Sequence, residues 1–265
     1  MKKIIILIIG LTLGSLAYSD VNQYPTYDQS EDKQLLRIDI IQTIAHPALN
    51  NTYRGIIDQL VLEGFVAKKN TEIRFANAQG DVSLSNQIAK KFASGEPDVI
   101  VAIPTQAAQS AVNATRQTNI PVVFSSVTDP IDAGLVKDLS QPSTNVTGVS
   151  NFINLDEQLV LFKQILPNLK RLGFIYSPGE VNSVRILKSL EKIASKYDIE
   201  IITSVAAKTT EVSGATNKLI EKVDAIFISN DNNALAAFGV ITKIALTAKI
   251  PVFVSDNQCK EGETF

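Results

Sequence analysis

The chain has 265 residues, of which 45% are hydrophobic and 20% are charged, and its formal net charge is −2. These values are ordinary for a packed globular protein, and the absence of a basic excess argues against nucleic acid as a partner. The single cysteine, Cys259, excludes an internal disulfide, and with the single histidine, His46, it cannot supply the four ligands of a structural zinc site. We therefore expect neither a metal nor a cofactor.

Residues 1–19 have the pattern of a secretory signal peptide. Two lysines precede a short apolar core, and the segment closes on Ala17-Tyr18-Ser19, which predicts cleavage near Ser19. An uncleaved membrane anchor is the alternative, although the core is interrupted and shorter than the ~20 residues that a spanning helix needs. Residues 20–34 are polar and predict a disordered lead-in. The pattern indicates a periplasmic protein.

Beyond residue 34, apolar runs of strand length alternate with helical patterns. The first series predicts strands at 36–41, 73–76, 99–103 and 121–124, and helices at 51–64, 82–94 and 105–115. The second series predicts helices at 155–166, 182–196, 210–222 and 234–248, and strands at 171–176, 200–204, 225–229 and 251–254. Uniformly apolar strands separated by helices are typical of parallel sheets that are covered on both faces.

A polar, turn-rich segment at 140–150 separates the two series. We therefore expect two similar α/β lobes, an N-terminal lobe over residues 35–126 and a C-terminal lobe over residues 127–254.

Polar loops follow most of the predicted strands, at 42–47, 104–106, 125–130, 177–183, 230–233 and 255–257. Each loop taken alone has a capping or turn explanation. Ligands of open parallel sheets nevertheless bind outside the carboxyl ends of the strands. Loops from two lobes that face one another would suit a zwitterion, with hydroxyls and helix N–H groups for a carboxylate and an acidic side chain for an ammonium. Four or five such hydrogen bonds would give roughly micromolar affinity.

Signals of an enzyme are weak in this sequence. A Ser-His-Asp triad would have to use His46, and there is no Gly-x-Ser-x-Gly elbow, dinucleotide fingerprint or Walker-type loop. We predict that the protein is not an enzyme. His46 is either a loop residue near a helix start or a ligand contact.

Several of these loops also carry a family resemblance. The segments are Ala45-His46-Pro47-Ala48-Leu49, Asn77-Ala78-Gln79-Gly80-Asp81, Phe124 through Pro130, Asn145 through Ser150, Tyr176 through Ser183 and Val223-Asp224-Ala225. Together they resemble the tryptophan/tyrosine-type substrate-binding proteins of ABC importers, from about Leu36 to Asp256. The Thr-Asp-Pro and Pro-Gly-Glu-x-Asn-Ser stretches, in that order, are the most specific part.

The resemblance implies a type I periplasmic-binding-protein fold: two Rossmann-like lobes, with parallel sheets flanked by helices, that close on an amino acid, aromatic or otherwise apolar. By matching motif, the first lobe would contribute Thr105, Ser126 and Asp129, with His46 as a further candidate. The second would contribute Glu180, Asn182 and Ser183, with Asp231 and Asp256 near the hinge. The implied partner is an ABC permease in the membrane, and we expect a monomer.

Relatives in this family continue past the Asp256 region with a strand and a helix that return to the first lobe. Residues 255–265 would only begin that crossover, so the resemblance also predicts a fold truncated at the C-terminus, with reduced stability. The rival functions are a sensory receptor for a membrane kinase or chemoreceptor, a truncated, non-functional relative, and a repressor of the same fold. The repressor would need a DNA-binding head where the signal peptide lies. Four aromatic residues could stack on a ligand, although core packing competes for most of them: Tyr53, Phe152, Tyr176 and Phe238.

Overall fold

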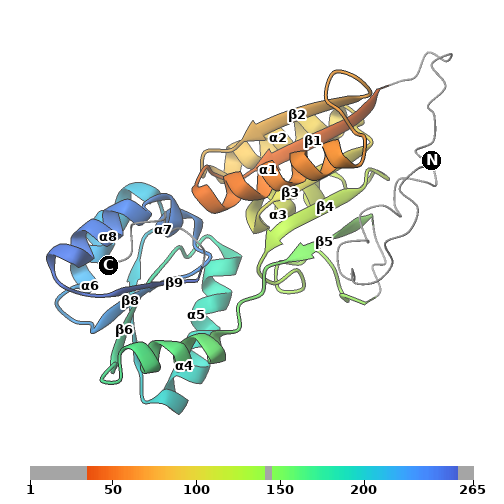
Figure 1. Cartoon of the computed structure of the whole chain (residues 1–265). Coiled ribbons are helices and arrows are strands. Elements are labelled where there is room, and N and C mark those ends of the chain that lie inside the picture. Colours follow the sequence, from red (N-terminus) through yellow and green to blue (C-terminus); the bar gives the residue numbers. More distant parts are fainter. Residues whose placement is uncertain (1–34, 141–144, 256–265) are drawn as a thin grey trace, which may run out of the picture. The chain divides into compact units, whose positions relative to one another are not determined.

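A computed structural model describes residues 35–140 and 145–255 (Figure 1). The predicted signal peptide, the polar lead-in, Asp256 and Cys259 lie outside the described residues. Within those residues, no helix combines the length and the apolar character needed to cross a membrane.

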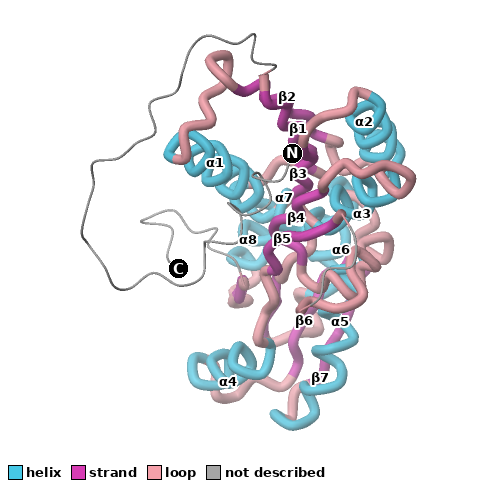
Figure 2. Tube along the Cα trace, turned by 90° about the vertical axis from the view of Figure 1, so that its right-hand side faces the viewer, coloured by secondary structure: helices cyan, strands magenta, loops and turns pink. Residues whose placement is uncertain are grey.

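The first sheet has five strands in the order β2-β1-β3-β4-β5, and all neighbouring strands are parallel. Its strands are β1 (Leu36–Gln42), β2 (Thr71–Asn77), β3 (Val99–Ile103), β4 (Val122–Val127) and β5 (Val146–Ser150). Its helices are α1 (Pro47–Leu62), α2 (Val82–Ser94) and α3 (Thr105–Ala114). Figure 2 shows α1 on one side of these strands and α2 and α3 on the other.

Alternation along β3 explains this layering. Val99, Val101 and Ile103 pack in one buried cluster with Leu49 of α1. Ile100 and Ala102 pack in another with residues of α2 and α3. Because successive side chains of a strand point to opposite faces, a strand covered on both faces must be apolar at every position.

The second sheet has four parallel strands in the order β7-β6-β8-β9. Its strands are β6 (Arg171–Tyr176), β7 (Glu200–Val205), β8 (Ala225–Ile228) and β9 (Val252–Val254). Its helices are α4 (Leu155–Ile165), α5 (Val181–Ala194), α6 (Val212–Leu219), α7 (Asn232–Ala236) and α8 (Phe238–Thr247), with short 3₁₀ turns η2 (Ser195–Tyr197) and η3 (Thr209–Glu211). One buried cluster joins this sheet to α4 and α5, and another joins it to α6, α7 and α8. The predicted α/β class with parallel sheets flanked by helices is confirmed.

The segment between the two series differs from the prediction. Residues 146–150 form β5, which pairs with β4 in the first sheet, although the sequence suggested a turn-rich separator and a lobe boundary after Ser126. Because Gly148 has no side chain, β5 can approach β4 where Phe124 lies. We therefore call residues 35–150 the first half of the chain and residues 151–255 the second half.

Three helices also differ in their bounds. α1 begins at Pro47, earlier than predicted, because proline is favoured in the first turn of a helix. The helix predicted at 234–248 is two helices, α7 and α8, that meet at Ala237. The helix predicted at 210–222 begins as a 3₁₀ turn and its α-helical part ends at Leu219.

Candidate functional site

The first half's predicted site residues lie at the end of β4 and in the segments that follow β1, β3 and β4. Thr105 is the first residue of α3, directly after β3, and it is 2% exposed. Its Oγ1 atom is buried and has no hydrogen-bond partner among the described residues. The hydroxyl at this helix start is thus available to a bound group.

Ser126 lies in an irregular part of β4. The pairing of β4 with β5 shifts register between Phe124 and Val127, and Ser126 has a φ of 58°, in the left-handed region. Its Oγ lies 3.0 Å from Oγ1 of Thr52 on α1. The strand therefore continues past Phe124, where the sequence predicted its end, and the bulge sets the direction of the Ser126 hydroxyl.

Glu180 precedes α5 and is 7% exposed. Its Oε2 atom accepts three hydrogen bonds, from Nδ2 of Asn182 at 2.9 Å and from the backbone N and Nδ2 of Asn232 at 3.1 and 2.6 Å. Its Oε1 atom accepts only a long one, from Nδ2 of Asn233 at 3.4 Å. One carboxylate oxygen is thus fixed, and the other keeps capacity for a further partner.

Burial raises the pKa of Glu180 to about 8, and the neighbouring Asp231 carboxylate contributes to this shift. The amide donors around Oε2 oppose the shift. Without a cationic partner, Glu180 is therefore mainly protonated at neutral pH.

Asp231 and Ser183 form an internal network beside Glu180. Asp231 accepts hydrogen bonds from N and Oγ of Ser177, from Oγ of Ser183 and from N of Ala234, at 2.7–3.1 Å. Asp231 and Ser183 are both 0% exposed. Burial raises the pKa of Asp231 even though these donors oppose the shift. Both oxygens of this carboxylate already bind the loops after β6 and β8 to one another.

His46 precedes α1 and is 4% exposed. Its Nε2 atom lies 3.4 Å from Oδ1 of Asn232. Because Nδ2 of Asn232 donates to Glu180, its Oδ1 is the acceptor, and His46 Nε2 then carries the proton. Glu180 and its donors Asn182, Asn232 and Asn233 form what we call the Glu180 cluster. The contact joins His46 of the first half to this cluster in the second half.

Asp129 binds Arg185 of α5. Its Oδ1 accepts from the backbone N atoms of Ile131 and Asp132, and its Oδ2 accepts from Nε of Arg185 at 3.2 Å. Partial burial favours a higher pKa for Asp129, but these donors outweigh it and lower the pKa. The carboxylate is therefore ionised and already paired.

Four other buried polar atoms without a hydrogen-bond partner among the described residues lie at the carboxyl ends of strands or in the segments that follow them. They are Oε1 of Gln42, Oδ1 of Asn182, Oγ of Ser229 and Oγ of Ser255, whereas Nε of Arg37 and Oε1 of Gln158 lie elsewhere. Buried polar groups in folded proteins are almost always hydrogen-bonded, to protein, water or ligand. These atoms make the strand ends the candidate site.

A cavity of about 480 Å³ adjoins this region. Phe152, Ile153 and Leu161 supply apolar walls, and Asn230 is among its polar residues. The backbone oxygen of Asn230 accepts from Asn182 Nδ2, so the cavity borders the Glu180 cluster. Of the four aromatic residues considered from the sequence, Phe152 alone lines the cavity, and it is 71% exposed.

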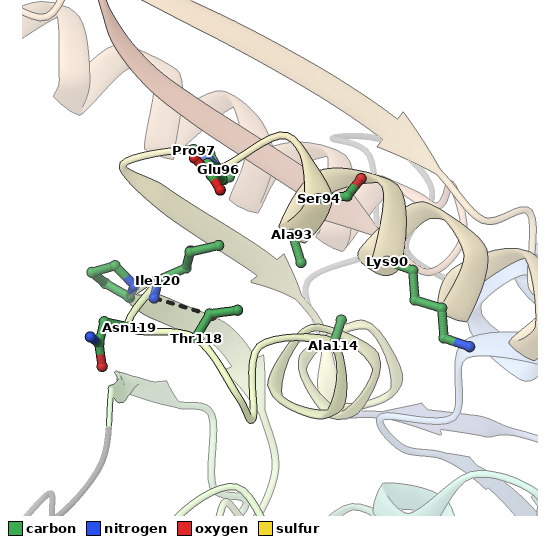
Figure 3. A pocket seen from close by; sticks show the side chains of 10 residues that line it. Lys90, Ala93, Ser94, Glu96, Pro97, Ala114, Thr118, Asn119 and Ile120 are labelled. Atoms are coloured by element: carbon green, nitrogen blue, oxygen red, sulfur yellow. Dashed lines mark hydrogen bonds between the residues drawn. The ribbon is translucent and has the colours of Figure 1, made fainter.

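A second hollow, of about 640 Å³, lies elsewhere, at the amino ends of β3 and β4 (Figure 3). Ala93, Pro97, Thr118 and Ile120 are among the residues that line it. None of the predicted site residues that the structure describes lines this hollow or the cavity beside Asn230. Since the loops with the buried polar atoms are at the opposite strand ends, we do not place the site here.

Sequence reasoning missed several residues of this cluster. Asn232, Asn233 and Arg185 bind the predicted carboxylates, and Thr128 accepts from Asn230 at 3.2 Å. The run Asn230 through Asn233 signalled a polar loop, but not which side chain reaches Glu180. In the part of the chain that the structure describes, there is no group of three acidic, histidine or cysteine side chains able to hold a metal ion.

Two three-layer α/β units, each with a parallel sheet and with buried polar residues at its strand ends, define the class of type I periplasmic binding proteins. Solved structures confirm this fold. The chain matches a conserved domain protein from Vibrio cholerae O1 biovar El Tor at a TM-score of 0.83 and 39% identity, covering 85% of this chain and 75% of that one. It matches the ABC domain in complex with L-Trp from Streptococcus pneumonia at a TM-score of 0.81 and 33% identity, with the same coverage.

Residues 37–264 match the family described as ABC transporter substrate binding protein, and the chain belongs to this family. A tyrosine-binding protein of Clostridioides difficile (strain R20291) is 36% identical over 261 residues, which span 96% of this chain and 75% of that protein. The family is one of solute-binding proteins, which agrees with the expectation of a non-enzymatic role.

Proposed function

We propose that this protein is the periplasmic receptor of an ABC importer and that it binds an aromatic amino acid between its two halves. The observation that carries the proposal is the set of buried polar atoms without a hydrogen-bond partner at the strand ends of both sheets; one of them belongs to Ser255, which lines a cavity with apolar walls. Relatives named for tyrosine binding and solved with L-Trp support the same ligand class.

The amino-acid backbone of the ligand would bind to the polar atoms. The Thr105 hydroxyl at the start of α3 suits the carboxylate, because a helix N-terminus favours a negative charge. Oε1 of Glu180 suits the ammonium. The positive charge of the ammonium would favour the ionised form of Glu180, which is otherwise protonated at neutral pH. Asp231 and Ser183 would support the loops without touching the ligand, because their polar atoms are already bonded.

The side chain of the ligand would occupy the cavity of about 480 Å³ beside Asn230. Phe152 offers a ring for stacking, and Asn151, Asn154 and Gln158 offer amides for a phenol hydroxyl or an indole N–H. A ligand held by both halves would stabilise the arrangement in which they are together, and that state would dock on the permease as a monomer.

Calorimetric titration of the purified protein with L-tyrosine, L-tryptophan, L-phenylalanine and L-leucine tests the proposal. We expect affinity in the micromolar range or tighter for at least one aromatic amino acid and weaker binding of leucine. Thr105→Val should weaken binding about tenfold, because it removes a hydrogen bond to a charged group.

Thr118→Val is the matched control, since Thr118 lines the hollow at the opposite strand ends. It should leave the affinity unchanged. Absence of heat with every amino acid tested, at protein concentrations that would detect micromolar binding, would overturn the proposal.

A further inference from the structure

We propose that Arg185 is a positioning residue that ties the two halves together through Asp129 and Asp132, and thereby raises ligand affinity without touching the ligand. The inference rests on the proposed function. It assigns Asp129, a ligand-binding candidate from the family resemblance, to this ion pair instead of to the ligand.

The geometry places one guanidinium between two carboxylates of the other half. Nε of Arg185 lies 3.2 Å from Oδ2 of Asp129 and 2.5 Å from Oδ2 of Asp132. Arg185 projects from α5 in the second half, and both aspartates lie in the loop between β4 and β5 in the first. The pairs therefore form only when the halves are together.

Both ends of this contact are held in place. Asp129 is oriented by the backbone N atoms of Ile131 and Asp132. Arg185 is oriented by its own helix, because its Nη1 donates to Oγ of Ser189 at 2.7 Å. A pre-oriented ion pair loses less side-chain entropy on forming than one between free side chains.

Buried apolar clusters do not join the two halves. Each buried hydrophobic cluster that the structure describes lies within one half. Two further side-chain hydrogen bonds join the halves, between His46 and Asn232 at 3.4 Å and between Asn230 and Thr128 at 3.2 Å. Among the described residues, the Arg185 pairs are the ion pairs between an arginine or lysine of one half and an acid of the other, and their removal should shift the balance between joined and separated arrangements.

The experiment compares Arg185→Gln with the wild type and with Arg171→Gln, by calorimetric titration with the aromatic amino acid that binds. Arg171 pairs with Asp224 at 2.7 Å within the second half, at similar exposure, and is the matched control. We expect the Kd of Arg185→Gln to rise about two- to fivefold, the effect of a partly exposed ion pair, and that of Arg171→Gln to stay unchanged.

Salt gives a second readout that a merely structural role would not move. Raising sodium chloride from about 0.05 M to about 1 M should weaken wild-type binding and leave the affinity of Arg185→Gln nearly constant, since screening acts on a pair the variant lacks. Equal affinities of Arg185→Gln and the wild type at low salt would overturn the proposal.

Small-angle scattering of the ligand-free protein separates this proposal from the proposed function. Arg185→Glu, which places three negative charges together, should have a larger radius of gyration than Arg171→Glu, with both variants retaining the wild-type circular dichroism spectrum. If the wild type binds no amino acid, the receptor assignment fails, and an equal radius for the two variants would then overturn the role of Arg185.

Discussion

Glu180 shows how burial changes the charge of a side chain that the sequence presents simply as acidic. The carboxyl group lies behind Asn182 and Asn232, beside the second buried acid, Asp231. Burial disfavours the ionised form, and a like charge nearby disfavours it further. A cation that binds beside such a carboxyl group stabilises its ionised form, lowers its pKa and causes it to release the proton.

The raised pKa of Glu180 predicts how the stability of the ligand-free protein depends on pH. The folded state holds a proton from pH 4.5 to about 8 that the unfolded state releases. The free energy of unfolding contributed by this group is therefore greatest below pH 4.5 and falls as the pH rises through 8. Glu180→Gln, which cannot ionise, should lose this dependence.

Thermal unfolding of both proteins at several pH values checks the prediction. At pH 8 to 9 the variant should be more stable than the wild type by about 4 kcal/mol, a rise in Tm of roughly 8–16 °C, and at pH 4.5 the gain should vanish. Parallel curves for variant and wild type across this range would contradict the assignment.

At the scale of elements, the contact between β4 and β5 depends on a glycine. A Cβ atom built on Gly148 would lie 2.1 Å from the backbone oxygen of Phe124 and 2.5 Å from its ring. Neither atom belongs to the flexible end of a side chain, so the strands would have to separate. The residue allows β5 to complete the first sheet and, with it, the loop that carries Asp129.

Gly148→Ala should therefore destabilise the protein by about 3 kcal/mol or more and lower the Tm by roughly 6–12 °C. Gly214→Ala is the control, because a Cβ atom added there would meet no other atom within 4 Å and α6 would gain helix propensity. Equal unfolding temperatures for these two variants would show that β5 does not pack against Phe124 as described.

At the scale of the whole molecule, the two halves have separate apolar cores and meet through polar contacts. Hydrophobic burial accounts for most of the folding free energy, so each half is stabilised internally and their association only weakly. A ligand that binds both halves binds only the folded protein, and it therefore raises the free energy of unfolding as its concentration rises.

We expect the matching aromatic amino acid, at 100 times its Kd, to stabilise the folded protein by about 2.7 kcal/mol, a rise in Tm of roughly 5–11 °C. Differential scanning fluorimetry with increasing ligand measures this shift. D-amino acids of the same side chain serve as controls for general solute effects. A ligand that binds by calorimetry but leaves the Tm unchanged would contradict binding to the folded state.

Much of the architecture follows from the sequence. Strands such as β3 and β6 are apolar at nearly every position, and Asp81 and Asn154 cap the helices that start at the predicted residues 82 and 155, so alternating elements and parallel sheets follow from local chemistry. The motifs at Phe124–Pro130 and Tyr176–Ser183 in turn carried the resemblance to the family that the chain belongs to.

The tertiary structure decided what each polar residue can still bind. From the sequence, Asp129, Glu180 and Asp231 were equivalent acids at strand ends. In the fold, Asp231 has all its bonds inside the second half, Asp129 meets Arg185, and Glu180 keeps one oxygen with spare capacity. The physical reason is that hydrogen-bond capacity and dielectric surroundings depend on neighbours that are 50 or more residues away along the chain. Local sequence sets the type of each group, and only packing sets its partners.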